Sequence, residues 1–151
     1  MHVLECVNLF FAGLLAGAEL VVRFGVRAPL AALDERPQIR LRQALIRTLR
    51  VVVPSLYVPA ALTGIAVTVW NASGTGFALQ CVALSAVLVW TVATFGGTVP
   101  INEGILEWRA DAPPADWRAI VHRWERLDTV RSWAAAGSFA FFLAAVARQL
   151  T

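Results

Sequence analysis

The chain has 151 residues, of which 58% are hydrophobic and 15% are charged, whereas soluble domains carry about 45–50% apolar and about 25% charged residues. This composition excludes an ordinary soluble protein, and the length allows one domain, residues 1–151. The formal net charge is +3, and all 13 basic residues are arginines. Because these arginines flank apolar runs, they indicate membrane orientation and no nucleic-acid partner.

Four apolar runs approach or exceed the roughly 20 residues that a helix needs to cross a bilayer. We expect the first span to end at Arg27 and Pro29, and the third to end at Gly96 and Gly97, before Pro100. The sequence thus predicts an all-α fold, a four-transmembrane-helix bundle. Its spans are expected at about residues 3–26, 51–70, 77–97 and 132–147.

The connection between the third and fourth spans is predicted to contain an amphipathic helix. Asp116, after two prolines, is positioned to cap its start. The polar stripe of this helix is expected to contain Arg118, His122, Glu125 and Arg126. The stripe expected to be buried recurs at helical spacing and consists of Trp117, Ile120, Val121, Trp124, Leu127, Asp128 and Arg131.

Arginines are concentrated in two connections and are absent from the turn at residues 71–76. With four spans, the two connections lie on one side, and the positive-inside rule places them in the cytoplasm and both termini outside. A bacterial plasma membrane is the expected location. The first connection contains Arg36, Arg40, Arg42, Arg47 and Arg50, and the second contains Arg109, Arg118, Arg123, Arg126 and Arg131.

The first span carries charges, which commonly cost a few kcal/mol each inside a bilayer. Glu5, Asn8, Glu19, Arg23 and Arg27 fall within a stripe of roughly 120° on one face of the helix. One interpretation is an ion pair in which the charges of Glu19 and Arg23 only neutralise each other, without a functional role. The other is a functional site built around these two residues.

Metal and nucleotide sites lack sequence support. His2 and His122 are expected on opposite sides of the membrane, so a histidine-rich metal site is not predicted, although a site using only Glu19 and Asp128 stays open. Cys6 and Cys81 form no C-x-x-C motif, and are expected to be two small apolar residues, although a disulfide between them is geometrically allowed. The chain has no glycine-rich phosphate loop.

Three sequence features occur along the chain in the order in which a known family of membrane proteins carries them. They are Asn8 followed by a glycine-rich stretch (residues 12–17), the Val-Pro-Ile-Asn step that ends at Asn102, and a W-x-x-x-D-x-x-R step from Trp124 to Arg131. With these features the chain resembles the anthrone oxygenase-like family of small membrane proteins along nearly its whole length. One departure is Asp128, since the family usually carries His or Asn there.

The resemblance implies an enzyme that oxidises an anthrone-like aromatic polyketide to a quinone with molecular oxygen as co-substrate and without an organic cofactor. A base is needed to form the carbanion, and a cation is needed to stabilise the oxyanion. The candidate catalytic residues are Asp128 or Glu19 as the base, and Arg131 and Asn102 as oxyanion ligands. The candidate substrate-binding residues are Arg23, Asn8, Trp117 and Trp124.

Three other functions are compatible with this sequence. A redox-neutral cyclase or isomerase of a polyketide or terpenoid would use the same acid and base. A small exporter also places a glutamate in its first span, but the long third connection fits it poorly. The remaining alternative is a non-catalytic membrane scaffold. The expected partners are a hydrophobic small molecule and the lipid bilayer, and homo-oligomerisation is compatible with the chain.

Overall fold

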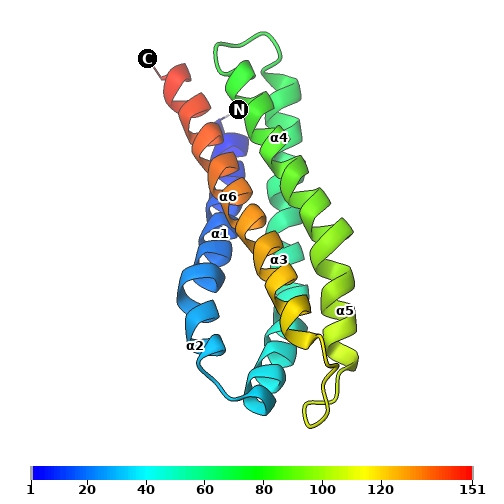
Figure 1. Ribbon diagram of the computed structural model, residues 1–151. Coiled ribbons are helices and arrows are strands. Elements are labelled where there is room, and N and C mark those ends of the chain that lie inside the picture. The colour runs from blue at the N-terminus through cyan, green and yellow to red at the C-terminus, as the bar shows by residue number, and fades with distance from the viewer. Residues whose placement is uncertain (1, 151) are drawn as a thin grey trace.

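The fold was obtained as a computed structural model that describes residues 2–150. Four helices in this part of the chain are long and apolar enough to cross a membrane: His2–Ala31, Glu35–Trp70, Phe77–Glu107 and Trp117–Gln149. Their arrangement confirms the predicted all-α, four-transmembrane-helix bundle (Figure 1). Two of the four are divided by a short π-helical segment. The segments are α1 (His2–Val21), η1 (Val22–Val26), α2 (Arg27–Ala31), α3 (Glu35–Trp70), α4 (Phe77–Ala93), η2 (Thr94–Thr98), α5 (Val99–Glu107) and α6 (Trp117–Gln149).

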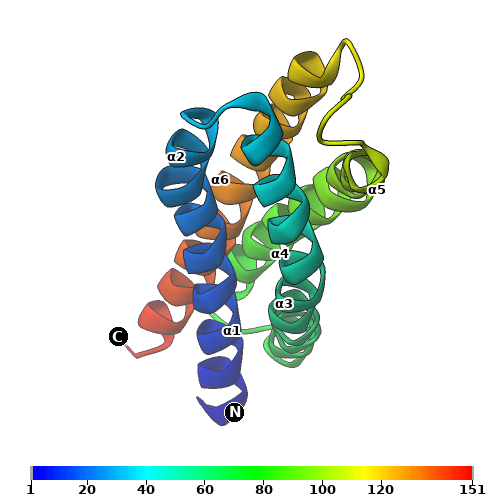
Figure 2. The ribbon, with the colours of Figure 1, turned by 90° about the horizontal axis from the view of Figure 1, so that it is seen from below.

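The two ends of the bundle differ in what they carry (Figure 1). Both termini and the turn between α3 and α4 lie at one end, which we call the terminal end. The connections between α2 and α3 and between α5 and α6 lie at the other, the connection end. Viewed from the connection end, α2 and α5 lie on opposite sides, with the start of α3 between them (Figure 2).

The first helix does not end where Arg27 and Pro29 were predicted to close it. It continues through η1 and α2 to Ala31. Pro29 follows directly after η1, where the wide turn already interrupts the regular i→i−4 hydrogen bonds that a proline would otherwise break. The second helix begins at Glu35, far ahead of the predicted start at residue 51. With 36 residues it is about 54 Å long, so its arginine-rich first half extends the bundle beyond the apolar span.

The third helix also continues past its predicted end. Gly96 and Gly97 lie inside η2, and Pro100 is accommodated at the start of α5, where its missing N–H costs little. The predicted amphipathic helix is not a separate element, because residues 117–149 form one unbroken α-helix, α6. Asp116 precedes α6 without a capping hydrogen bond from its side chain.

Small residues allow the helices to approach closely in the core. An added Cβ at Gly64 would lie 2.8 Å from the ring of Phe142, and one at Gly97 would lie 2.7 Å from Leu127. Both glycines therefore serve close helix packing. The buried apolar cluster at the centre of the bundle contains Leu15, Ala16, Trp90 and Ala135. A second cluster, near the connection end, contains Ile39, Trp117 and Val121.

Candidate functional site

A cavity of about 310 Å³ lies between the helices, and all four long helices contribute to its wall. This volume is near the lower limit for small-molecule sites, which are mostly apolar with a few convergent polar groups. The apolar part of the wall consists of Ala18, Val22, Val26, Leu30, Leu45, Ile46, Leu49, Val53, Pro54, Phe95 and Val99. The charged part consists of Glu19, Arg27, Arg42, Arg50, Asp128 and Arg131, and the remaining lining residues are Tyr57, Trp90, Thr94, Thr98, Asn102 and Trp124.

Glu19 is fixed at the deep end of the cavity by two donors. Its Oε1 atom accepts a hydrogen bond from Arg131 Nη2 and a second from Trp90 Nε1, at 3.1 Å. The guanidinium of Arg131 also lies over the Trp90 ring, 5.0 Å from its centroid. Glu19 is only 3% exposed. A buried carboxylate with two such donors is held in one place and is suited to positioning Arg131.

An aromatic wall continues from Trp90. The ring of Tyr57 stacks on the Trp90 ring, with centroids 4.6 Å apart and planes inclined by 22°. The Tyr57 hydroxyl is 2.8 Å from Thr91 Oγ1, a hydrogen bond that links α3 to α4. The wall is therefore rigid and offers a flat π surface to a ligand.

Asp128 differs from Glu19 in its contacts. It is 1% exposed, yet its Oδ2 atom has no hydrogen-bond partner in the part of the chain that the structure describes. The nearest cation is Arg27, whose Nη1 is 3.7 Å from Oδ2. Arg27 is shared, since its Nη2 lies 3.4 Å from Glu125. Asp128 thus presents a carboxylate oxygen without a donor at the wall of the cavity.

The amide of Asn102 is oriented by Trp124. The indole Nε1 of Trp124 donates to Asn102 Oδ1 at 2.9 Å. Because an indole N–H can only donate, this bond assigns the acceptor side of the amide. The Nδ2 side of Asn102 is then left to donate to a ligand in the cavity.

Sequence reasoning missed several lining residues, among them Tyr57, Trp90 and Arg42. Arg42 was missed because it was assigned to a cytoplasmic arginine cluster. It is 5% exposed, and its guanidinium lies over the Trp124 ring, 5.2 Å from the centroid. The signal that could have found it is its spacing from Ile39 and Ile46, which places all three residues on one face of α3. Gln43 secures this part of α3 by donating to the carbonyl oxygens of two residues at the end of α5, at 2.9 Å each.

Both π-helical segments face the cavity. In each, a backbone N–H bonds five residues back, from Arg27 to Val22 in η1 and from Val99 to Thr94 in η2. Such segments are rare and frequently occur at functional sites. They determine the rotation of α2 and α5, and hence the direction of Arg27 and Asn102.

Residues 43–141, about two thirds of the chain, match the sequence model of a family described as anthrone oxygenase. The chain belongs to the anthrone oxygenase family. In the two other comparisons, neither a curated protein nor a solved structure matches the chain. The matched segment contains Asn102, Asp128 and Arg131, whereas Glu19 and Arg42 lie outside it and complete the cavity.

The structure brings five of the eight predicted site residues to the cavity of this family member: Glu19, Asn102, Trp124, Asp128 and Arg131. The other three lie elsewhere. Asn8 donates to Ala60 O at 3.0 Å nearer the terminal end, and Trp117 donates to Glu35 at 3.1 Å in the second core cluster.

Arg23 is the third residue outside the cavity. Its guanidinium lies over the rings of Phe24 and Trp133, at 5.3 and 5.6 Å. The interpretation of Glu19 and Arg23 as an ion pair is therefore wrong, because Glu19 pairs with Arg131 across the bundle instead. The polar residues of the first helix therefore contact different partners at different positions along the bundle.

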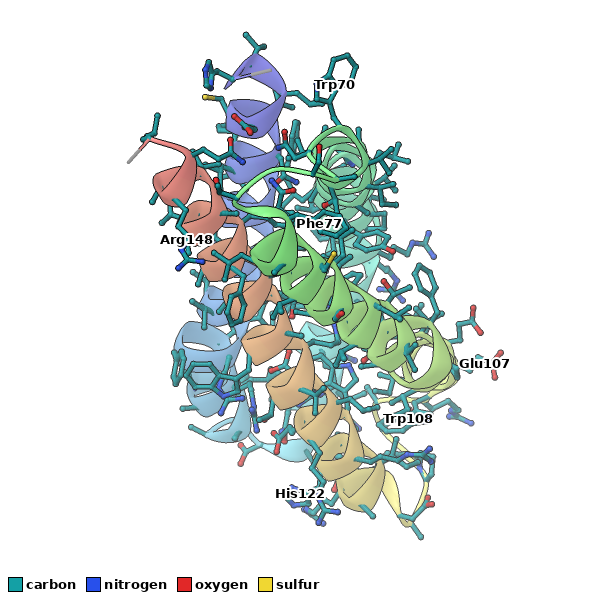
Figure 3. The ribbon with its side chains drawn as sticks, turned by 90° about the horizontal axis from the view of Figure 1, so that it is seen from above. Trp70, Phe77, Glu107, Trp108, His122 and Arg148 are labelled. Carbon is teal, nitrogen blue, oxygen red and sulfur yellow. The ribbon has the colours of Figure 1, made fainter. Side chains whose placement is uncertain are left out.

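The expectations for metal ligands and for the two cysteines can be compared with the geometry. Within residues 2–150 no three His, Cys, Asp or Glu side chains cluster as metal ligands would. His122 projects from the outside of α6 (Figure 3) and pairs with Glu125 at 3.4 Å. Both cysteines are free thiols, Cys6 exposed and Cys81 partly buried. Independence from an organic cofactor stays a prediction.

Proposed function

We propose that this family member oxidises a flat, hydrophobic anthrone-like ketone to a quinone with molecular oxygen, inside the cavity. The observation that supports this most is Asp128, a buried carboxylate with an oxygen that accepts no hydrogen bond, beside an aromatic-walled space of about 310 Å³. A desolvated carboxylate with an oxygen that accepts no hydrogen bond is a suitable general base. Glu19, with two donors on one oxygen, is the weaker candidate.

The reaction begins with a proton transfer from carbon. Asp128 removes a proton from the methylene group opposite the ketone of the anthrone, and the electron pair delocalises onto the ketone oxygen as an anionic enolate. This enolate is the reductant: it transfers electrons to dioxygen, a C–O bond forms at the deprotonated carbon, and a hydroperoxide results. Loss of the remaining C–H proton and cleavage of the O–O bond give the second ketone and water. One anthrone and one dioxygen thus yield one anthraquinone and one water.

The cavity supplies two groups for the developing negative charge. Arg131 is a fixed cation, because Glu19 and the Trp90 ring hold its guanidinium from two sides. The Nδ2 group of Asn102 is a preoriented neutral donor. Preorganised donors of this kind stabilise an enolate oxygen without reorganisation during the reaction. Glu19 is then a positioning residue that acts through Arg131.

The test is oxygen-dependent turnover by the purified protein in detergent. With anthrone as substrate, we expect anthraquinone formation above the uncatalysed rate, with one dioxygen consumed per quinone. Heat-denatured protein controls for autoxidation. Conversion of the substrate without oxygen consumption would overturn the oxidation and favour the redox-neutral cyclase or isomerase, which uses the same base.

We also propose that the connection end faces the cytoplasm. Both arginine-rich connections lie at that end (Figure 1), and arginines near span ends favour the cytoplasmic side. In a variant without the native cysteines, a cysteine at Gly74 should react with an impermeant thiol reagent in intact cells. A cysteine at Asp111 should react only after permeabilisation. The opposite pattern would reverse the orientation.

A further inference from the structure

The charged groups around the cavity do not all form direct ion pairs. Arg131 pairs with Glu19, and Arg27 is shared between Glu125 and Asp128. Arg42, in contrast, has no carboxylate within ion-pair distance among residues 2–150. Its Nε atom is buried and has no hydrogen-bond partner there.

An unmatched arginine is costly in this position. Burial removes water from the guanidinium, and a buried charge is normally paired or hydrogen-bonded. Stacking on the Trp124 ring at 5.2 Å covers one face of Arg42. The N–H groups along the edge remain to be satisfied, and their planar fork matches a carboxylate. A carboxylate that enters the cavity would satisfy these N–H groups.

The position of Arg42 relative to the base sets the length of the ligand. Trp124, Asp128 and Arg131 follow one another on one face of α6, over a rise of about 10 Å. Arg42 contacts the first of them, and Glu19 with Trp90 contacts the last. A ligand that spans the cavity would have one end at Arg42 and its middle beside Asp128.

We infer that the aromatic substrate carries a carboxylate, and that Arg42 binds it at the end of the cavity opposite Glu19. This inference names the substrate class and rests on the proposed function, because it takes the cavity as the active site. The aromatic surfaces of Trp124, Trp90 and Tyr57 favour a flat ring system over an acyl chain as the rest of the ligand.

Binding without turnover tests this inference. The probes are anthraquinone-2-carboxylate and anthraquinone-2-carboxamide, which share a ring system and differ in charge. Dissociation constants are measured in a neutral detergent, by quenching of tryptophan fluorescence. We expect the wild-type protein to bind the carboxylate roughly 30-fold or more tightly than the amide, the scale of a buried charged hydrogen bond. Equal affinities would overturn the inference.

Matched variants then locate the effect. Arg42→Gln should abolish the preference for the carboxylate, and Arg42→Lys should retain part of it through its charge. Arg40→Gln is the control, because Arg40 lies exposed on the same helix outside the cavity lining. If Arg42→Gln folds and keeps the full preference, Arg42 is not the anion ligand.

A third ligand separates an aromatic acid from a lipid-like one. Dodecanoate should bind wild-type protein clearly more weakly than anthraquinone-2-carboxylate, and equal or tighter binding would overturn the assignment to an aromatic acid. Since none of these measurements needs oxygen, the outcome is independent of the oxidation assay. A protein that selects the carboxylate but consumes no oxygen would retain the anion site and lose the proposed oxidation.

Discussion

The two halves of the bundle both bury polar groups, but only one half places charged groups without partners beside a large cavity. Neutral groups without partners, Gln80 and Ser138, are buried towards the terminal end. Towards the terminal end, the Asn8 amide donates to Ala60 O and Thr63 Oγ1, and the Asn71 amide donates to Glu5. Towards the connection end, atoms of Asp128, Arg42 and Arg131 lack partners. A large cavity accompanies only the second group.

This difference shows that the presence of buried polar side chains does not by itself identify a ligand-binding site. A cavity of only about 10 Å³ lies between Ala60 and Trp90, enough for about one water-sized molecule. Gln80 on α4 also has an amide without partners, but it lines neither cavity. Unmatched polar atoms indicate a ligand where they line a space that can contain one, as they do around Asp128.

Breaking the Glu19–Arg131 pair should have the largest effect. Either Glu19→Gln or Arg131→Gln leaves a buried charge without its partner, which we expect to lower the free energy of unfolding in detergent by about 3–5 kcal/mol. The double variant should recover part of this loss, because no unpaired charge remains. Additive losses, measured by thermal unfolding, would show that the two side chains do not interact.

Asp128→Asn should separate chemistry from folding at the connection end. Asp128 makes no hydrogen bond through Oδ2, and Arg27 keeps Glu125 as an ion-pair partner when the Asp128 charge is removed, so we expect little change in melting temperature. Turnover should fall roughly 10²-fold, the usual scale for loss of a general base. The contrary result, a parallel loss of stability and activity, would identify Asp128 as a structural clasp between α6 and α2. Full activity in this variant would remove Asp128 as the base.

The smallest effect is expected at the terminal end. Asn8→Ala removes two hydrogen bonds from a site with little free space, and should cost about 1–2 kcal/mol of stability. Turnover per folded molecule should stay at the wild-type level, because Asn8 lies outside the cavity. Melting temperature and turnover are measured on the same preparation. A drop in turnover without destabilisation would extend the site to this half.

Hydropathy was enough to predict the four spans, because a run of apolar residues must be helical to cross a bilayer. Hydropathy did not predict where the helices begin and end. Prolines and glycines were interpreted as breaks, but Pro29 and Pro100 lie in first turns, and Gly96 and Gly97 lie in η2. Hydropathy also divided α6 in two, because it cannot show whether a polar helix joins an apolar one without interruption.

The site was predicted where helical spacing places residues together on one element. Trp124, Asp128 and Arg131 share a face of α6, and all three line the cavity. Contacts across the bundle were missed, since the partner of Glu19 lies 112 residues away at Arg131. Arg42 was missed for another reason. The sequence pattern of an arginine near a span end does not distinguish a side chain that faces solvent from one that faces the bundle.

The two π segments make the geometry of the cavity depend on residue count as well as residue identity. Each contains a turn one residue longer than an α-helical turn allows. Deletion of Gly96, a residue whose own side-chain position is open space, would let η2 close as ordinary α-helix. The wide turn accommodates one extra residue, so the later residues of α5 would keep roughly their present facing. A one-residue deletion within the regular helix α4 has no such compensation: it would rotate α5 by about 100° around the axis relative to the first turns of α4. The same one-residue deletion would therefore preserve the facing of Asn102 when it falls in η2 and change that facing when it falls in α4, although the apolar span stays intact in both cases.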